Sequence, residues 1–125
     1  MTAGVSSANA APSHHNTGPV STGCATDART IRTFGVDATT WVDVRYSPKC
    51  GTNWLRFSNN AKTGWLKITS DWNPSVPVEK YVNPGDSVYW SNQVYAPGST
   101  CITVQASIRS GWPGTWNATA PLRIC

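Results

Sequence analysis

The sequence is poor in acidic residues and in methionine. Asp and Glu together number six among 125 residues, Met occurs once, and only 13% of all residues are charged. Long helices with many ion pairs need more Glu and Lys than this, so the composition disfavours a helical protein. Gly, Pro, Ser, Thr and Asn are frequent instead, which is typical of strands joined by tight turns.

Histidine is also scarce, because His14 and His15 are the only two in the chain. We expect both to lie in a mobile terminal segment, where they cannot be held beside a nucleophile as a catalytic triad requires. Several of the six carboxylates stand beside turns, where Asp serves local backbone bonding. A glycine-rich phosphate loop and a nucleophile elbow are both absent from the sequence. We therefore expect no enzymatic activity, no cofactor and no metal site.

Long apolar runs are missing, since no stretch approaches the roughly 18 consecutive apolar residues of a membrane span. The ten basic residues are spread from Arg29 to Arg123 and give a formal net charge of +4. Nucleic-acid binding favours a clustered basic patch, so these scattered charges argue against that function.

Four cysteines are present, and no pair has the short C-x-x-C spacing of zinc and redox sites: Cys24, Cys50, Cys101 and Cys125. Two disulfides are the better interpretation, and they imply an oxidising compartment outside the cytosol. Of the three possible pairings, we predict Cys24 with Cys50 and Cys101 with Cys125. Each of these bonds would tie together strands within one half of the sequence.

The N-terminal region differs in composition from the rest. Residues 7–10 read Ser-Ala-Asn-Ala, an A-x-A pattern typical of signal-peptide cleavage sites, but the apolar stretch of a complete signal peptide is missing. A disordered leader is the alternative. Residues 11–23 are polar and lack apolar periodicity, so we expect a flexible arm that contributes little to stability. We therefore divide the chain into a signal-peptide remnant and arm over residues 1–23 and an all-β domain over residues 24–125.

Short alternating segments begin after Cys24 and predict an antiparallel β-sandwich or barrel. In residues 41–46, Val42, Val44 and Tyr46 should face the core. Residues 101–109 give the strongest core strand, through Ile102, Val104, Ala106 and Ile108. Further strands are predicted over residues 53–58, 64–72, 76–82, 87–95 and 120–125. Pro77 should place its strand at a sheet edge, because proline cannot donate a ladder hydrogen bond.

Tryptophan is abundant, with seven in the chain. This exceeds what a core of this size normally holds, so we expect some indoles to be exposed. Trp41 should lie opposite the core face of its strand, while Trp112 and Trp116 should lie in a loop, where exposed aromatic side chains often contact partners. A structural role, in which indoles cover the rims of a thin sandwich and pack on arginine stems, is an equal alternative.

Residues 44–56, Val-Arg-Tyr-Ser-Pro-Lys-Cys-Gly-Thr-Asn-Trp-Leu-Arg, resemble the signature of a family of small secreted proteins labelled YjfA-like, a domain of unknown function abundant in actinobacteria. Cys24 and residues 27–30 are similar to the first cysteine and strand of that family. The resemblance implies a secreted, β-rich protein and brings no established catalytic residues. Arg45 and Arg56, on alternating strands, can lie near Trp54 and Trp41.

We expect a secreted, non-catalytic protein-binding or adaptor module whose partner is a secreted or cell-surface protein. An adaptor role in an extracellular antibacterial toxin assembly is an analogy of architecture, in which the arm would dock on the partner. The alternatives are a cell-wall or carbohydrate-binding module and an inhibitor of a secreted enzyme. The candidate binding residues are Trp41, Arg45, Trp54, Arg56, Trp112 and Trp116.

Overall fold

The computed structural model describes residues 10–110 and 114–125, and over these residues the protein is all-β. Two short 3-10 helices, η1 (Pro12–His14) and η2 (Cys24–Asp27), precede the strands. The strands are β1 (Arg29–Gly35), β2 (Trp41–Ser47), β3 (Thr52–Phe57), β4 (Thr63–Ser70), β5 (Val78–Val82), β6 (Val94–Tyr95), β7 (Ile102–Ser110), β8 (Thr115–Ala118) and β9 (Leu122–Ile124).

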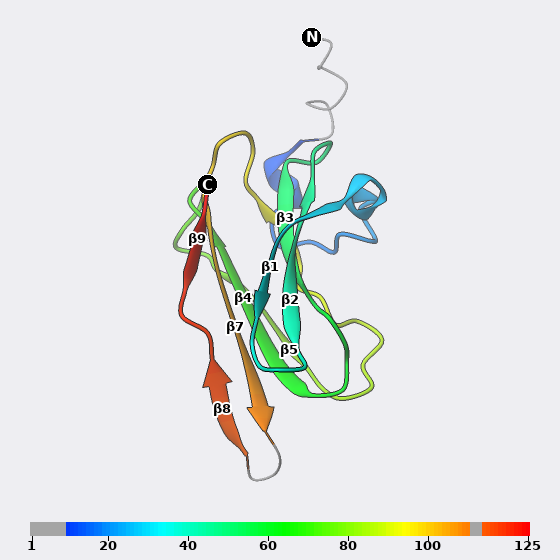
Figure 1. Cartoon of the computed structure of the whole chain (residues 1–125). Coiled ribbons are helices and arrows are strands. Elements are labelled where there is room, and N and C mark those ends of the chain that lie inside the picture. The colour runs from blue at the N-terminus through cyan, green and yellow to red at the C-terminus, as the bar shows by residue number, and fades with distance from the viewer. Residues whose placement is uncertain (1–9, 111–113) are drawn as a thin grey trace.

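These strands form two antiparallel sheets (Figure 1). The first has the order β1-β2-β3-β6, and the second has the order β5-β4-β7-β8, with β9 also pairing with β7. One apolar core joins the sheets, with Val44 and Leu55 from the first and Leu66 and Val104 from the second. The predicted all-β sandwich is therefore confirmed.

Alternation places side chains as the sequence predicts in the two clearest strands. In β2, Val42 and Val44 are fully buried, whereas Tyr46 is only half-buried. In β7, all four predicted core residues are buried: Ile102, Val104, Ala106 and Ile108. Pro77 directly precedes β5, which is an edge strand as expected.

Other strands differ from the prediction. Residues 87–95 form only the two-residue strand β6, preceded by an isolated bridge between Trp90 and Arg56. Alternation did not indicate β1 or β8, because these strands are largely exposed on both faces. Trp116 therefore belongs to a strand and not to the expected loop. Both predicted disulfides are present, Cys24–Cys50 and Cys101–Cys125, and each closes a loop for which about 3 kcal/mol of stabilisation is typical.

The N-terminal segment, residues 11–23, corrects the expectation of a free arm. The Asn16 N–H donates to Gln93 O at 2.7 Å, and the Gln93 N–H donates to Thr17 O at 2.9 Å. The Tyr95 N–H donates to Nδ1 of His15 at 3.1 Å. The segment thus lies along the chain that leads into β6 and is held there mainly by hydrogen bonds, with Pro19 as its one buried residue. This explains why its polar composition gave no sign of order.

Candidate binding site

A recess of about 180 Å³ opens on the outer face of the four-stranded sheet. It brings together three of the predicted binding residues, Arg45, Trp54 and Arg56. The other residues that line it come from outside the strands: Val20, Ala25, Tyr89 and Trp90. We call this site the arginine recess.

Strand pairing positions the predicted residues of the recess. β2 and β3 are antiparallel, with Arg45 opposite Trp54 and Asp43 opposite Arg56. Directly opposed residues point to the same face of a sheet, so these four side chains share the outer face. Two hydrogen bonds fix the guanidinium group of Arg45. It donates to Thr30 Oγ1 in β1 at 2.8 Å and to Ala28 O, just before β1, at 3.3 Å.

Residues 89–91 follow β3 closely without forming a regular strand. The Phe57 N–H donates to Tyr89 O at 3.0 Å, and the Ser91 N–H donates to Leu55 O at 2.8 Å. These bonds fix Tyr89 and Trp90, whose rings meet edge to face with centroids 5.4 Å apart. The sequence predicts a strand over residues 87–95, but residues 87–90 contact β3 only through these bonds and the isolated bridge between Trp90 and Arg56.

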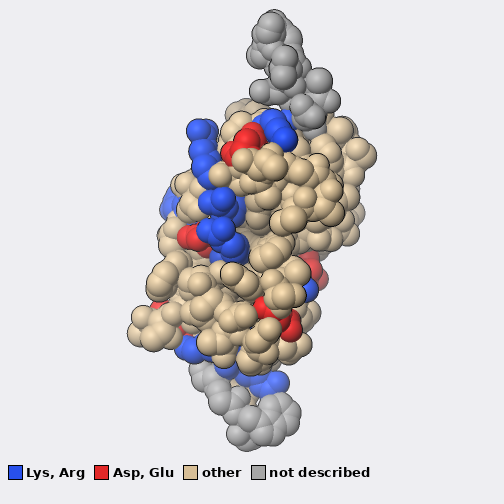
Figure 2. All heavy atoms as spheres, turned by 90° about the vertical axis from the view of Figure 1, so that its right-hand side faces the viewer, with Lys and Arg blue, Asp and Glu red and all other residues tan. Residues whose placement is uncertain are grey.

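The recess carries more positive than negative charge. Arg56 pairs with Asp43 at 3.0 Å, and the second oxygen of Asp43 accepts a hydrogen bond from Thr33 at 2.9 Å. Arg45 makes no ion pair with any residue that the structure describes. Burial, and then the positive charge of Arg56, lower the pKa of Arg45. The recess therefore holds two guanidinium groups, of which only Arg56 is paired with a carboxylate among the described residues. Figure 2 shows Lys and Arg side chains gathered in a column on the side of the molecule that carries η2.

Trp54 is a structural part of this site and not a projecting contact residue. Only 3% of its surface is exposed, and Val20 and Ala25 line the same recess beside it. The indole therefore forms the base of the recess, in line with the structural role considered for the tryptophans. Val20, by contrast, is 63% exposed at the rim.

The remaining predicted binding residues lie elsewhere. Trp41 is 48% exposed and lies on the same face of β2 as Arg45, four residues away, which corresponds to roughly 13 Å along a strand. Trp116 is 43% exposed on β8 of the other sheet. Trp112 lies outside the described residues.

The turn between β2 and β3 is built by residues of the signature segment. The Ser47 hydroxyl donates to Oδ1 of Asp27 at 2.6 Å, and the Lys49 N–H donates to Oδ2 at 2.8 Å. The Cys50 N–H in turn donates to the Ser47 hydroxyl at 3.2 Å. These bonds hold the turn against η2, next to the Cys24–Cys50 disulfide. The signature segment therefore supplies the two strands and the turn on which Arg45, Trp54 and Arg56 are placed.

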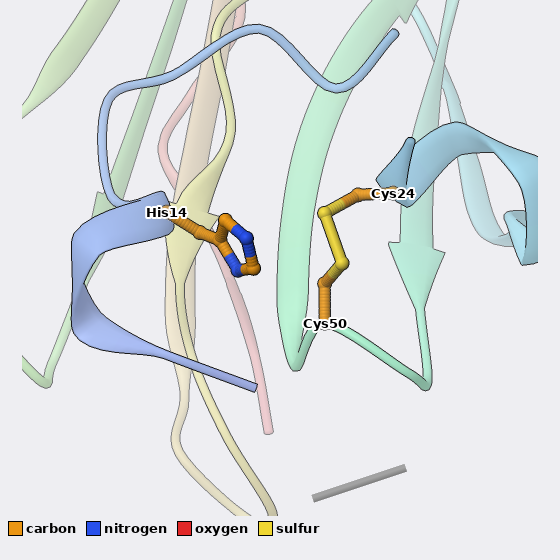
Figure 3. A group of neighbouring side chains, drawn as sticks. All are labelled: His14, Cys24 and Cys50. Atoms are coloured by element: carbon orange, nitrogen blue, oxygen red, sulfur yellow. A yellow bond between two sulfur atoms is a disulfide. The ribbon is translucent and has the colours of Figure 1, made fainter. Parts of the chain in front are cut away.

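His14 lies beside this disulfide, and its ring faces the two sulfur atoms (Figure 3). Candidate ligand atoms of His14, Cys24 and Cys50 lie within 4.8 Å of one another. Thiolates are the cysteine species that bind metals, and here both sulfurs are joined in a disulfide. The cluster can therefore hold a metal only after reduction.

Both histidines are held in the fold, so mobility is not a valid reason to exclude a triad. His15 accepts the Tyr95 N–H, and its ring packs against Trp72 with centroids 5.3 Å apart. Nδ1 of His14 is buried without a hydrogen-bond partner among the described residues.

The fold and the recess define a small, disulfide-linked β-sandwich with a basic, aromatic-lined surface site. Among the described residues, no helix has the length and apolarity needed to cross a membrane. The chain belongs to the family described as "Protein of unknown function (DUF2690)", whose family model matches residues 13–110. That match begins within the N-terminal segment and ends before β8. No curated protein and no solved structure matches the chain.

Proposed function

We propose that this protein is a secreted, non-catalytic protein-binding module, and that the arginine recess receives an acidic side chain of its partner. The observation that carries the proposal is the pair Arg45 and Arg56, two guanidinium groups beside aromatic rings, of which only Arg56 is paired with a carboxylate among the described residues. Arginine, tryptophan and tyrosine are the residue types most enriched at energetically important positions of protein interfaces. An incoming carboxylate would supply the ion pair that Arg45 lacks among the described residues.

The size of the recess supports a side chain as its occupant. A volume of about 180 Å³ is below the roughly 300–1,000 Å³ of typical small-molecule sites. A carboxylate on a short stem can reach the guanidinium groups while its apolar part contacts Tyr89 and Trp90. Binding of this kind gives orientation and specificity through paired hydrogen bonds.

The surroundings of Asp43 and His15 favour binding over catalysis at these two groups. Asp43 is occupied by Arg56 and Thr33, and His15 is engaged by Tyr95 and Trp72. A general base needs a free position within hydrogen-bond reach of its substrate.

Secretion is supported by the two disulfides, which persist in oxidising compartments. The YjfA-like subgroup, an actinobacterial source and an adaptor role in a toxin assembly remain predictions from the resemblance. The packed N-terminal segment changes the form of the adaptor hypothesis, because residues 11–23 already contact the domain. In our proposal this segment supplies Val20 as a rim of the recess.

The test compares partner capture by the full chain and by variants. Arg45→Gln combined with Arg56→Gln removes both guanidinium charges, and Arg32→Gln is the matched control, because Arg32 is an exposed arginine of β1 outside the recess. A native secretome is passed over each immobilised protein, and the captured partner is purified and titrated. We expect the double variant to lose at least about tenfold in affinity and the control to keep wild-type affinity.

Arg45 also holds Ala28 and Thr30, so the melting temperature of each variant is measured alongside binding. Arg45→Lys provides a second variant that keeps the charge but not the paired hydrogen bonds, and it should bind with intermediate affinity. Equal binding by the folded double variant and the wild type would refute the recess as the contact site.

A further inference from the structure

A second hollow, of about 290 Å³, lies on the outer face of the five-stranded sheet. Trp65, Tyr81, Ser107, Trp116 and Ala118 line it. Strand pairing places four of these in one row across the sheet, since Trp65 is opposite both Tyr81 and Ser107, and Ser107 is opposite Ala118. We call this hollow the aromatic groove.

The sides of the aromatic groove are large rings turned to solvent. Tyr81 is 63% exposed and Trp116 is 43% exposed, and their rings meet nearly at right angles with centroids 6.4 Å apart. Trp65 belongs to β4, which lies between β5 and β8 in the strand order of the sheet, and its Nε1–H donates to Glu79 Oε1 at 2.8 Å. Exposed rings in a fixed arrangement on a sheet face provide flat apolar surfaces for a ligand.

A buried hydroxyl at the floor of the groove is a second, independent indication of a ligand. Ser107 is 3% exposed, and its Oγ has no hydrogen-bond partner among the described residues. A buried hydroxyl without a partner typically costs about 1–3 kcal/mol, and such groups in native proteins call for an explanation. A ligand hydroxyl that enters the groove can supply the missing bond.

The charge of the lining narrows the class of ligand. None of the five lining residues is ionisable at neutral pH, and the nearby Glu79 is already bonded to Trp65. Arg109 lies opposite Trp116 on the same face but does not line the groove, so a ligand in the groove itself meets rings and hydroxyl groups and no charged side chain. A ligand that fits has one flat apolar face for the rings and hydroxyl groups at its edge.

We infer that the aromatic groove binds a neutral saccharide, with a pyranose ring stacked on the ring of Trp116 or Tyr81, the other ring at its edge, and a hydroxyl bonded to Ser107. β-1,4-linked glucose and N-acetylglucosamine units fit best, because their equatorial hydroxyls leave both faces of the ring apolar. The volume of about 290 Å³ is just below the roughly 300–1,000 Å³ found for small-molecule sites, which suits one or two sugar units. This site is on a different sheet from the arginine recess, and Trp116 lies beyond the residues of the family match.

The experiment titrates the purified full chain with cellohexaose and with N-acetylchitohexaose, using calorimetry and the intrinsic tryptophan fluorescence. We expect saturable binding of at least one oligosaccharide in the millimolar range or tighter. Tyr81→Ala and Trp116→Ala should each weaken it by about tenfold or more. Trp41→Ala is the matched control, because Trp41 is a similarly exposed tryptophan on the other sheet, and it should leave binding unchanged.

Two of these variants also separate this inference from structural effects and from the proposed function. Tyr81→Ala removes a largely exposed side chain, so its melting temperature should stay close to that of the wild type. The Arg45→Gln and Arg56→Gln double variant should bind the oligosaccharide normally. Failure of both oligosaccharides to bind, or equal binding by wild type, Tyr81→Ala and Trp116→Ala, would overturn the inference and leave the arginine recess untouched.

Discussion

The Thr52 hydroxyl donates a hydrogen bond to Oε1 of Gln93 at 2.7 Å, and both residues are fully buried. The side-chain nitrogen of Gln93 donates to Thr17 Oγ1 at 3.1 Å and to Thr22 Oγ1 at 3.0 Å. One buried amide thus joins β3 to the N-terminal segment at two points. Because a buried amide is costly unless its bonds are made, this arrangement requires the N-terminal segment to be in place.

We predict that Gln93→Leu destabilises the protein by about 2–4 kcal/mol, because it leaves the buried hydroxyl of Thr52 and those of Thr17 and Thr22 without their partner. Urea unfolding followed by fluorescence measures the change. Asn92→Ala is the control: Asn92 is exposed and also bonds to the segment, through Asn16, and its loss should cost under about 1 kcal/mol. Similar values for the two variants would show that the Gln93 network does not hold the segment.

Removing residues 1–23 should lower stability, contrary to what the polar composition of the segment suggests. The truncated chain keeps Cys24 but loses Thr17 and Thr22, the partners of Gln93, and His15, the partner of Tyr95. Trp54 also loses the neighbouring Val20. We expect a loss of about 2–4 kcal/mol, or roughly 10 °C in melting temperature, and a red-shifted tryptophan emission as Trp54 meets water. An unchanged melting temperature and emission would support the free arm instead.

The parts of the fold that the sequence predicts are those that depend on neighbours in the chain. Val42 and Val44 in β2, and Ile102 to Ile108 in β7, are buried on one face of paired strands, so alternation alone identifies them. The N-terminal segment is ordered by hydrogen bonds to Gln93, about 70 residues away, and such bonds leave no periodic pattern. The segment also explains why Trp54, which alternation places outward, is buried.

In the candidate site, too, the sequence predicts the residues on paired strands but not those placed by distant contacts. The facing of Arg45 and Trp54 follows from strand pairing and was predictable from the signature segment. Tyr89 and Trp90 reach the recess through an irregular stretch beside β3, and Val20 and Ala25 reach it from the N-terminal segment. Position in such segments depends on tertiary contacts, so a single sequence offers no rule that would have placed them.

We predict that Ser107→Ala leaves the free energy of unfolding unchanged or raises it, because the variant removes a buried hydroxyl that has no partner among the described residues. Ser47→Ala is the matched comparison, since Ser47 is equally buried but bonds to Asp27 and Cys50, and its loss should cost about 1–3 kcal/mol. Chemical denaturation of both variants without added saccharide measures the difference. A clear destabilisation by Ser107→Ala would indicate that the hydroxyl is bonded in the free protein.

The last prediction concerns Asp37, which joins the β1–β2 turn to the loop before β4. Nζ of Lys62 donates to Oδ2 of Asp37 at 2.6 Å, and the Thr39 N–H donates to Oδ1 at 2.9 Å. The hydrogen bond from Lys62, followed by the one from Thr39, lowers the pKa of Asp37 from 3.8 to about 2. Since the folded pKa lies below the unfolded one, the link is fully present above pH 3.8 and is lost as the pH falls through about 2.

Carboxyl chemical shifts followed by NMR during acid titration test this directly. We expect Asp37 to titrate near pH 2 in the wild type and closer to 3.8 in Lys62→Gln, because that variant removes the largest cause of the shift. Lys80→Gln, on β5, is the control, because Lys80 is not among the groups that shift the pKa of Asp37, and it should leave the Asp37 titration where it is. The carboxylate is exposed to solvent and salt screens such pairs, so the difference between wild type and Lys62→Gln should shrink at high ionic strength. Titration of the wild-type carboxyl at its ordinary value in low salt would show that Lys62 does not hold it.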